Sequence, residues 1–143
     1  MRGGRSESAG RELAAVVERL VRSLNPVAVV LFGSRARGDW GPWSDYDLLI
    51  IAEFEVPYLE RIALILETIG DTRLPIEPHP YTLGEALEML RRGSPTIVDA
   101  IEEGAVLYKG RGFERLLEEY RRLKRLGLRR TRTSIVVPGE PDR

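Results

Sequence analysis

Two apolar runs of strand length, separated by a polar loop, constrain the fold of this chain more than any other feature. Residues 27–32 (VAVVLF) form a continuous apolar run, and residues 45–52 (DYDLLIIA) form a second one that begins with two aspartates. Uninterrupted apolar strands are typical of sheets that are covered on both faces. Helical patterns flank both runs, so we expect an α/β (α+β) domain in which helices cover a small sheet.

Apolar periodicity predicts the covering helices. Apolar residues recur at three- and four-residue spacing over residues 12–24, 58–69 and 113–126, which is the pattern of a helix with one buried face. In residues 58–69 we expect that face to consist of Leu59, Ile62, Ala63, Leu66 and Ile69.

The second half of the chain carries shorter elements. Thr82 and Glu85 have the spacing of a capping box, which predicts a helix to about residue 92. A helix over residues 95–101 and a strand over residues 105–108 follow. The prolines at positions 75, 78 and 80 confine any strand over residues 74–81 to the edge of the sheet.

A length of 143 residues fits one hydrophobic core. We expect a flexible N-terminus over residues 1–11, a single domain over residues 12–126 and a C-terminal extension over residues 127–143. The extension has no helical period, and we interpret it as a mobile tail or as a strand that docks on a partner.

Composition excludes several kinds of site. The chain has no cysteine, so a bound metal must use oxygen or nitrogen ligands. Lys and Arg together equal Asp and Glu in number, at 22 each, and the balance predicts no overall attraction to nucleic acid or membrane. The absence of cysteine and of an apolar N-terminal segment leads us to expect a cytoplasmic protein.

The residues at the ends of the two apolar runs point to chemistry. Gly33 and Ser34 follow the first run, and Asp45 and Asp47 open the second. In a strand, two residues at this spacing face the same way, about 7 Å apart along the backbone. Paired carboxylates repel each other unless a cation compensates them, and hard oxygen ligands suit Mg²⁺ or Mn²⁺.

An Asp-x-Asp pattern alone is more often a polar strand entry than a metal site. The context favours the metal site here. Gly33 allows a phosphate to approach the backbone, and Ser34 offers a hydroxyl group and an amide N–H. Phosphate and metal ligands would then lie at the ends of adjacent strands.

The segment GSRARGDWGPWSDYDLLI is similar to the signature of the nucleotidyltransferase superfamily, whose fold resembles that of DNA polymerase β. The matching positions are Gly33, Ser34, Arg35, Gly38, Ser44, Asp45, Asp47 and Leu48. The spacing resembles that of minimal nucleotidyltransferases, and with the flanking elements the resemblance covers residues 12–108. Such domains often act as the antitoxin partner of a helical HEPN-domain toxin.

This resemblance implies a magnesium-dependent transfer of a nucleoside monophosphate, AMP from ATP, to an acceptor hydroxyl with release of pyrophosphate. Gly33 and Ser34 would hold the β- and γ-phosphates, and Asp45 and Asp47 would hold two Mg²⁺ ions, with Mn²⁺ as an alternative. The resemblance also implies that Ser44 contributes to nucleotide binding. Arg35 and Arg37 would neutralise the triphosphate, or are solvated loop charges.

Family members take a third carboxylate, usually Asp, from a later strand, and this chain offers Glu77 at that position. The longer side chain would move the oxygens by about 1.5 Å, which affects chemistry that depends on alignment. Asp39 and Asp71 are weaker candidates because both lie in expected loops. His79 shares the face of Glu77, but a lone histidine beside prolines is more often a partly exposed edge residue than a ligand.

Two other regions have open interpretations. Trp40 and Trp43 either stack on a base or partner or pack the loop itself. Seven basic residues near the C-terminus bind phosphates or an acidic partner, or form the solvated face of the last helix; they are Arg121, Arg122, Lys124, Arg125, Arg129, Arg130 and Arg132.

Three functions therefore remain open. The first is an enzyme whose acceptor is a hydroxyl of a protein, an RNA end or a small molecule such as an aminoglycoside; the toxin–antitoxin resemblance favours a tyrosine of a HEPN-like partner. The second is a binding module that keeps the fold and neutralises a partner by contact. The third is a nucleic-acid binder that uses the C-terminal basic residues. A protein partner or self-association is expected because the domain is too small to enclose a large acceptor.

Overall fold

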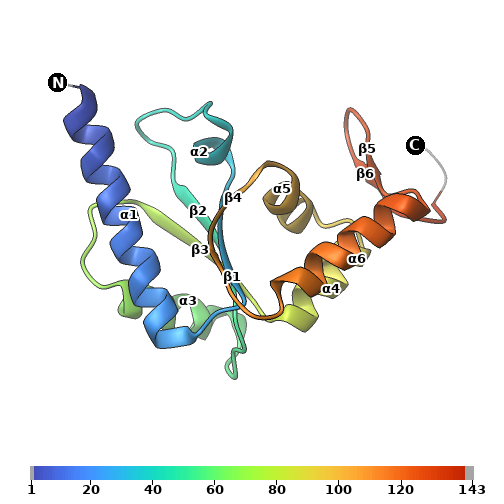
Figure 1. Cartoon of the computed structure of the whole chain (residues 1–143), viewed down its shortest axis with the longest axis horizontal. Helices are drawn as coiled ribbons and strands as arrows, with labels where there is room; N and C mark the ends of the chain where they lie inside the picture. Colours follow the sequence, from blue (N-terminus) through green and yellow to red (C-terminus); the bar gives the residue numbers. More distant parts are fainter. Residues whose placement is uncertain (1, 141–143) are drawn as a thin grey trace.

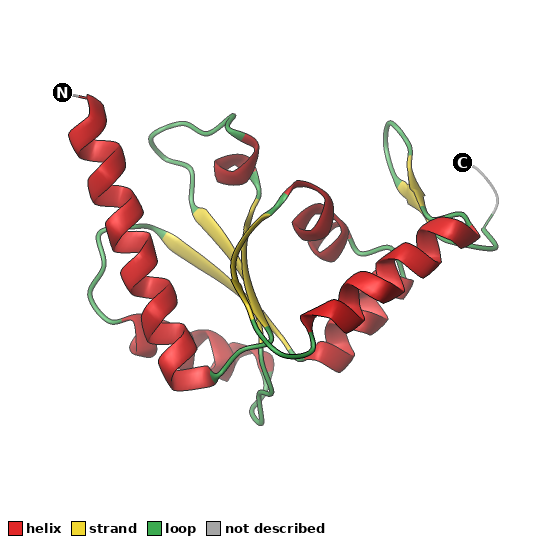
Figure 2. Cartoon of the chain, in the orientation of Figure 1, coloured by secondary structure: helices red, strands yellow, loops and turns green. Residues whose placement is uncertain are grey.

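The computed structural model describes residues 2–140 and shows the expected mixed α/β fold. A four-stranded sheet has the order β3-β2-β1-β4 (Figure 2). Its strands are β1 (Ala28–Phe32), β2 (Tyr46–Ile51), β3 (Ile76–Tyr81) and β4 (Ala105–Lys109). β1 runs antiparallel to both of its neighbours, and β3 runs parallel to β2.

Helices cover both faces of this sheet (Figure 1). They are α1 (Arg2–Leu24), α2 (Ser34–Arg37), α3 (Tyr58–Ile69), α4 (Leu83–Arg91), α5 (Pro95–Glu103) and α6 (Phe113–Leu126). α1 and α3 pack on one face, against the alternate residues Val29 and Leu31 of β1 and Leu48 and Ile50 of β2. α4, α5 and α6 pack on the other face. Among residues 2–140, no helix has the length and apolar character needed to cross a bilayer.

The expected strands and helices are present, and the predicted bounds of α3 and α6 agree with the structure. α1 begins at Arg2 instead of residue 12, because apolar periodicity reports only the part of a helix that packs on a core. Residue 1 and residues 141–143, the outermost parts of the two expected terminal segments, lie outside the described residues.

The predicted buried face of α3 was partly wrong. Ile69 is buried as expected, but Leu59 is 78% exposed and Leu66 is 46% exposed, and Arg61 and Ile65 are buried in their place. The helix is therefore rotated so that an arginine faces inward. Its guanidinium donates hydrogen bonds to the carbonyl of Val56 and to both carboxylate oxygens of Glu85, which satisfies the buried charge.

β3 lies at the edge of the sheet, as its prolines predicted. Pro78 and Pro80 are buried and alternate along the strand with Glu77 and His79. Because proline has no N–H, the residues that alternate with the prolines must donate the ladder bonds to β2. The prolines then occupy the positions at which an N–H group would point away from β2.

The described part of the C-terminal segment, up to residue 140, packs on the chain's own domain. Strands β5 (Arg129–Arg130) and β6 (Ile135–Val136) pair as a small antiparallel hairpin. Leu128 is 2% exposed and belongs to the core beneath α4, α5 and α6, and Ile135 and Val137 pack against that core. Val136 is also 2% exposed. Arg130 forms ion pairs with Asp99 and Glu102 of α5.

Candidate active site

A glycine turn joins β1 to α2 at one end of the sheet. Gly33 has φ 75° and ψ −158°, and its carbonyl accepts hydrogen bonds from the backbone N–H groups of Ala36 and Arg37 at 3.1 Å each. A Cβ atom at this position would lie 2.5 Å from Oδ2 of Asp47. The turn is therefore packed directly against the carboxylate of Asp47, and glycine is required both by conformation and by space.

Sheet register brings two of the predicted carboxylates together. Asp47 lies opposite Phe32 of β1 on one side and opposite Glu77 of β3 on the other. Each of Asp47, Glu77 and His79 offers a ligand atom within 4.8 Å of the other two. Asp47 alternates with Leu49, whose side chain packs toward α4, α5 and α6, so the cluster lies on that face of the sheet.

His79 holds Asp47 in place. Its Nε2 lies 3.1 Å from Oδ1 of Asp47, and its ring packs edge-on against Phe32, with the ring centroids 4.9 Å apart. Sequence reasoning gave this histidine less weight than the structure does. The available signal was its position two residues after Glu77 in a strand, which puts both side chains on one face.

Electrostatics at the cluster favour a cation. The pKa of Glu77 is raised above its ordinary value, chiefly by a hydrogen bond shared with Asp47, then by burial and by the Asp47 charge. His79 opposes this shift, and Asp45 adds to it. A positive ion bound beside Glu77 would stabilise its ionised form.

The donor set fits a divalent cation that prefers oxygen ligands. Two carboxylates and one imidazole suit Mn²⁺, and the carboxylates alone suit Mg²⁺ with water in the remaining positions. Asp45 lies one residue before β2, is exposed, and is outside the group of converging ligand atoms. Its effect on the pKa of Glu77 shows that its charge still reaches the site.

The polar residues of the loop between α2 and β2 mostly hold the loop itself. The guanidinium of Arg35 lies 4.3 Å from the ring centroids of both Trp40 and Tyr46, and its Nε donates to the carbonyl of Ser44. Tyr46 packs toward α1 and α3, so Arg35 extends to the face opposite the Asp47 carboxylate. The hydroxyl of Ser44 accepts a hydrogen bond from the N–H of Gly41.

The other predicted residues lie apart from the cluster. Arg37 is paired with Asp39, and this hydrogen bond raises the pKa of Arg37. Asp71 is exposed in the turn after α3. Trp40 is 51% exposed and Trp43 is 88% exposed, so the tip of the loop is available for contact with other molecules.

Comparison with known proteins gives the family. Residues 11–108, more than half of the chain, match the family described as nucleotidyltransferase domain. No curated protein sequence matches the chain significantly.

Several solved structures resemble the fold. A candidate nucleotidyltransferase from Sulfolobus solfataricus has 20% sequence identity and a TM-score of 0.48, with 69% of this chain and 78% of that chain covered. A toxin–antitoxin complex with AMP-PNP has 15% identity and a TM-score of 0.47, covering 78% and 88%. A mutant of the toxin–antitoxin pair MntA–HpeT has 14% identity and a TM-score of 0.44, covering 76% and 87%. From the family match and the carboxylate cluster beside the glycine turn, we conclude that the chain belongs to the nucleotidyltransferase domain family.

Proposed function

We propose that this chain transfers a nucleoside monophosphate, AMP from ATP, to an acceptor hydroxyl. The observation that carries the proposal is the convergence of Asp47 and Glu77, on adjacent strands, beside the Gly33 turn. Family membership supports the transfer of a nucleotidyl group.

In the proposed site, Asp47 and Glu77 would hold the divalent cation, with Asp45 as a further carboxylate one residue before β2. A bound cation would supply positive charge to the phosphate oxygens. Gly33 and Ser34 cradle the β- and γ-phosphates at the start of α2, and Ser44 keeps the loop closed beside them. His79 fixes the orientation of the Asp47 carboxylate through their hydrogen bond.

The transfer itself is a displacement at the α-phosphorus. The acceptor oxygen bonds to this phosphorus while the bond to the bridging oxygen breaks, and pyrophosphate leaves with the electron pair. The proton of the acceptor hydroxyl passes to a carboxylate of the site. Alignment of these groups provides most of the rate, because positioned reactants avoid the entropy of encounter.

For the acceptor we propose the tyrosine hydroxyl of a HEPN-like toxin partner, which the sequence signature suggests. The purified chain should label such a partner when it is incubated with ATP labelled at the α-phosphate and Mg²⁺ or Mn²⁺.

A matched pair of variants tests the site. Asp47→Asn should abolish labelling, whereas Asp71→Asn, which removes an exposed loop carboxylate of the same kind, should not. No transfer to protein, RNA or aminoglycoside acceptors with either metal would reject the proposal. Equal labelling by the two variants would show that the cluster is not the site.

Two observations favour the alternative of a binding module without turnover. Asp45 is outside the group of converging atoms, and the third carboxylate is a glutamate. If the module hypothesis holds, calorimetry should show tight partner binding that is unchanged by the double variant Asp45→Ala with Asp47→Ala, and no metal-dependent binding of ATP.

A further inference from the structure

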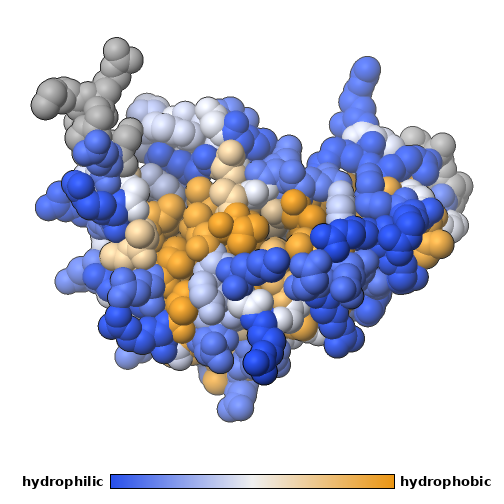
Figure 3. Space-filling model, in the orientation of Figure 1, coloured by the Kyte–Doolittle hydropathy of each residue, from blue (hydrophilic) through white to orange (hydrophobic). Residues whose placement is uncertain are grey.

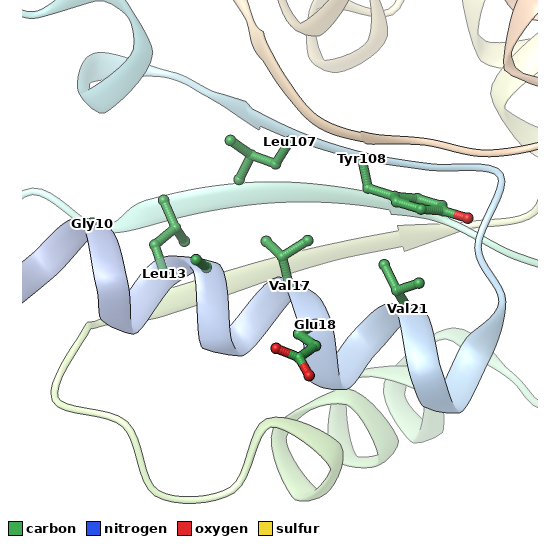
Figure 4. Close-up of a pocket in the computed structure, with 8 residues that line it drawn as sticks. Gly10, Leu13, Val17, Glu18, Val21, Leu107 and Tyr108 are labelled. Atoms are coloured by element: carbon green, nitrogen blue, oxygen red, sulfur yellow. The ribbon is translucent and has the colours of Figure 1, made fainter.

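An apolar groove of about 400 Å³ runs between α1 and β4, on the α1–α3 side of the sheet. It is lined by Gly10, Ala14, Val17 and Val21 of α1 and by Leu107 and Tyr108 of β4 (Figure 4). The space-filling view shows apolar side chains gathered on this face of the molecule, with polar groups around them (Figure 3). Such a contiguous exposed apolar surface marks an interaction site.

A β-bulge opens the groove. The register between β1 and β4 shifts from Val29 opposite Tyr108 to Val30 opposite Val106, so Leu107 is the extra residue. Bulges re-aim side chains, and here both Leu107 and Tyr108 contact the residues that pack beneath α1. A regular strand would turn one of these two side chains to the other face.

Small residues on α1 leave room for a second helix. Gly10 and Ala14 lie one turn apart, and both are exposed. A Cβ atom built on Gly10 would have no heavy atom within 4 Å. The distance between packed helices depends on the side chains at the contact, so these two residues permit a close approach.

The charges beside the groove are complementary to those of a second copy of the chain. Glu7, Arg11, Glu18 and Arg22 follow one side of α1 in alternating sign. A two-fold axis that passes between residues 14 and 15 places Glu7 opposite Arg22 and Arg11 opposite Glu18 of an antiparallel copy. Within the chain, Glu18 and Arg22 pair with each other at high exposure, and Arg11 has no ion-pair partner among the described residues.

We propose that the chain forms a two-fold symmetric dimer in which the α1 helices of two copies lie antiparallel and the two apolar grooves face each other. A two-fold interface must be complementary to itself, and both the small residues and the charge order of α1 satisfy this condition. The acceptor of the transfer reaction plays no part in this inference.

The dimer is tested by sedimentation velocity of the full chain over a concentration series. The unaltered chain should show a reversible monomer–dimer equilibrium. Ala14→Glu should raise the dissociation constant by at least ~10-fold, because the symmetry buries the added charge twice. A chain that stays monomeric at every concentration would overturn the proposal, and so would a dimer that Ala14→Glu leaves unchanged.

Exchanging the charges of Arg11 and Glu18 tests whether the two α1 helices are antiparallel. Arg11→Glu and Glu18→Arg should each weaken the dimer, by about tenfold, since each variant creates two like-charge contacts. The double variant should regain most of the original affinity. Failure of the double variant to recover would reject the antiparallel arrangement. All of these side chains are exposed, so the unfolding midpoint of each variant should stay close to that of the unaltered chain when both are measured at a concentration at which they are monomeric.

A control separates this groove from another exposed apolar surface. Leu59, Ala63 and Leu66 form an apolar stripe on the outer face of α3. Ala63→Glu should leave the dimer intact. A dimer that dissociates with Ala63→Glu and persists with Ala14→Glu would assign the interface to α3 and overturn the proposal.

Discussion

Backbone conformation and the available space both favour glycine at position 33. Its positive φ favours glycine, and the space beside it is filled by the carboxylate of Asp47. A methyl group here would displace a side chain that we propose as a metal ligand. The effect on function should therefore exceed the effect on folding.

Gly33→Ala should lower the rate of nucleotidyl transfer by about 100-fold, because an error of about 1 Å in a reacting group has effects of this size. Its free energy of unfolding should fall by only ~1 kcal/mol, through backbone strain. Gly38→Ala is the matched control, since Gly38 has φ 87° and nothing within 4 Å of its Cβ position. Equal losses of activity in the two variants would show that contact with Asp47 is unimportant.

Glu77 and Asp47 make the metal-free site unfavourable at neutral pH. The raised pKa of Glu77 means that folding favours its protonated form, so its contribution to stability is full at low pH and is lost as pH rises through the raised pKa. Glu77→Gln should therefore stabilise the metal-free chain at pH 7 by about 0.2–1 kcal/mol, the usual size of a cross-strand pair.

Thermal unfolding with a chelator present measures this effect. The advantage of Glu77→Gln should disappear as pH falls below the pKa of Glu77. The same variant should lose Mn²⁺ binding in calorimetry. A variant that is less stable than the unaltered chain at pH 7 would contradict the assigned repulsion.

At the scale of single elements, the buried Arg61 joins α3 to the start of α4. Its guanidinium binds both oxygens of Glu85, at 2.6 and 3.1 Å. Glu85 also completes the capping box of α4 with Thr82. The carboxylate of Glu85 therefore caps the N-terminus of α4 and also neutralises the buried charge of Arg61 on α3.

Glu85→Gln keeps a residue suited to the capping box but leaves Arg61 buried and unpaired. It should lower the free energy of unfolding by about 2 kcal/mol at pH 7, a value reduced by the partial exposure of Glu85. Thr82→Ala, which removes only the cap, should cost about 1 kcal/mol. Urea titrations measure both.

The pH dependence of this pair has the opposite sign to that of Glu77. Arg61 holds the pKa of Glu85 below its ordinary value of 4.5. The pair therefore stabilises the chain above that pH and loses its effect as pH falls through the lowered pKa. The difference between the unaltered chain and Glu85→Gln should vanish in acid; a constant difference would contradict the assignment.

The sequence predicted the positions of helices and strands better than it predicted which of their side chains face inward. Periodicity located α3, but an apolar pattern could not reveal that Arg61 finds hydrogen-bond partners in Val56 and Glu85, so this arginine was not expected on the buried face.

The family resemblance suggested Glu77 as the third carboxylate, and the pairing of β2 with β3 places it opposite Asp47. Strand alternation suggested that Asp45 and Asp47 face the same way, but Asp45 lies outside the group of converging ligand atoms. Strand alternation also could not show that Arg35 turns to the opposite face, because that depends on the ring positions of Trp40 and Tyr46.

At the scale of the whole molecule, the C-terminal hairpin is part of the core. Val136 is 2% exposed, and a Cβ on Gly93 would lie 2.7 Å from Val137. The sequence could not reveal this docking, since a two-residue strand is too short to show a period.

Val136→Ala should lower the free energy of unfolding by about 2 kcal/mol, through loss of buried methyl groups. Arg132→Ala, an exposed position in the same hairpin, should have almost no effect. Chemical denaturation of the two variants provides the comparison. Equal stabilities would mean that the hairpin is detached in solution.

The prolines of β3 affect which edge of the sheet can accept an additional strand. Pro78 and Pro80 remove two of the N–H groups that the outer edge of β3 would otherwise present, so an incoming peptide strand finds no donor at these two positions. β4, at the opposite border, contains no proline. Any assembly that lengthens the sheet must therefore add to β4, and the approach to Glu77 and His79 stays open to an arriving substrate.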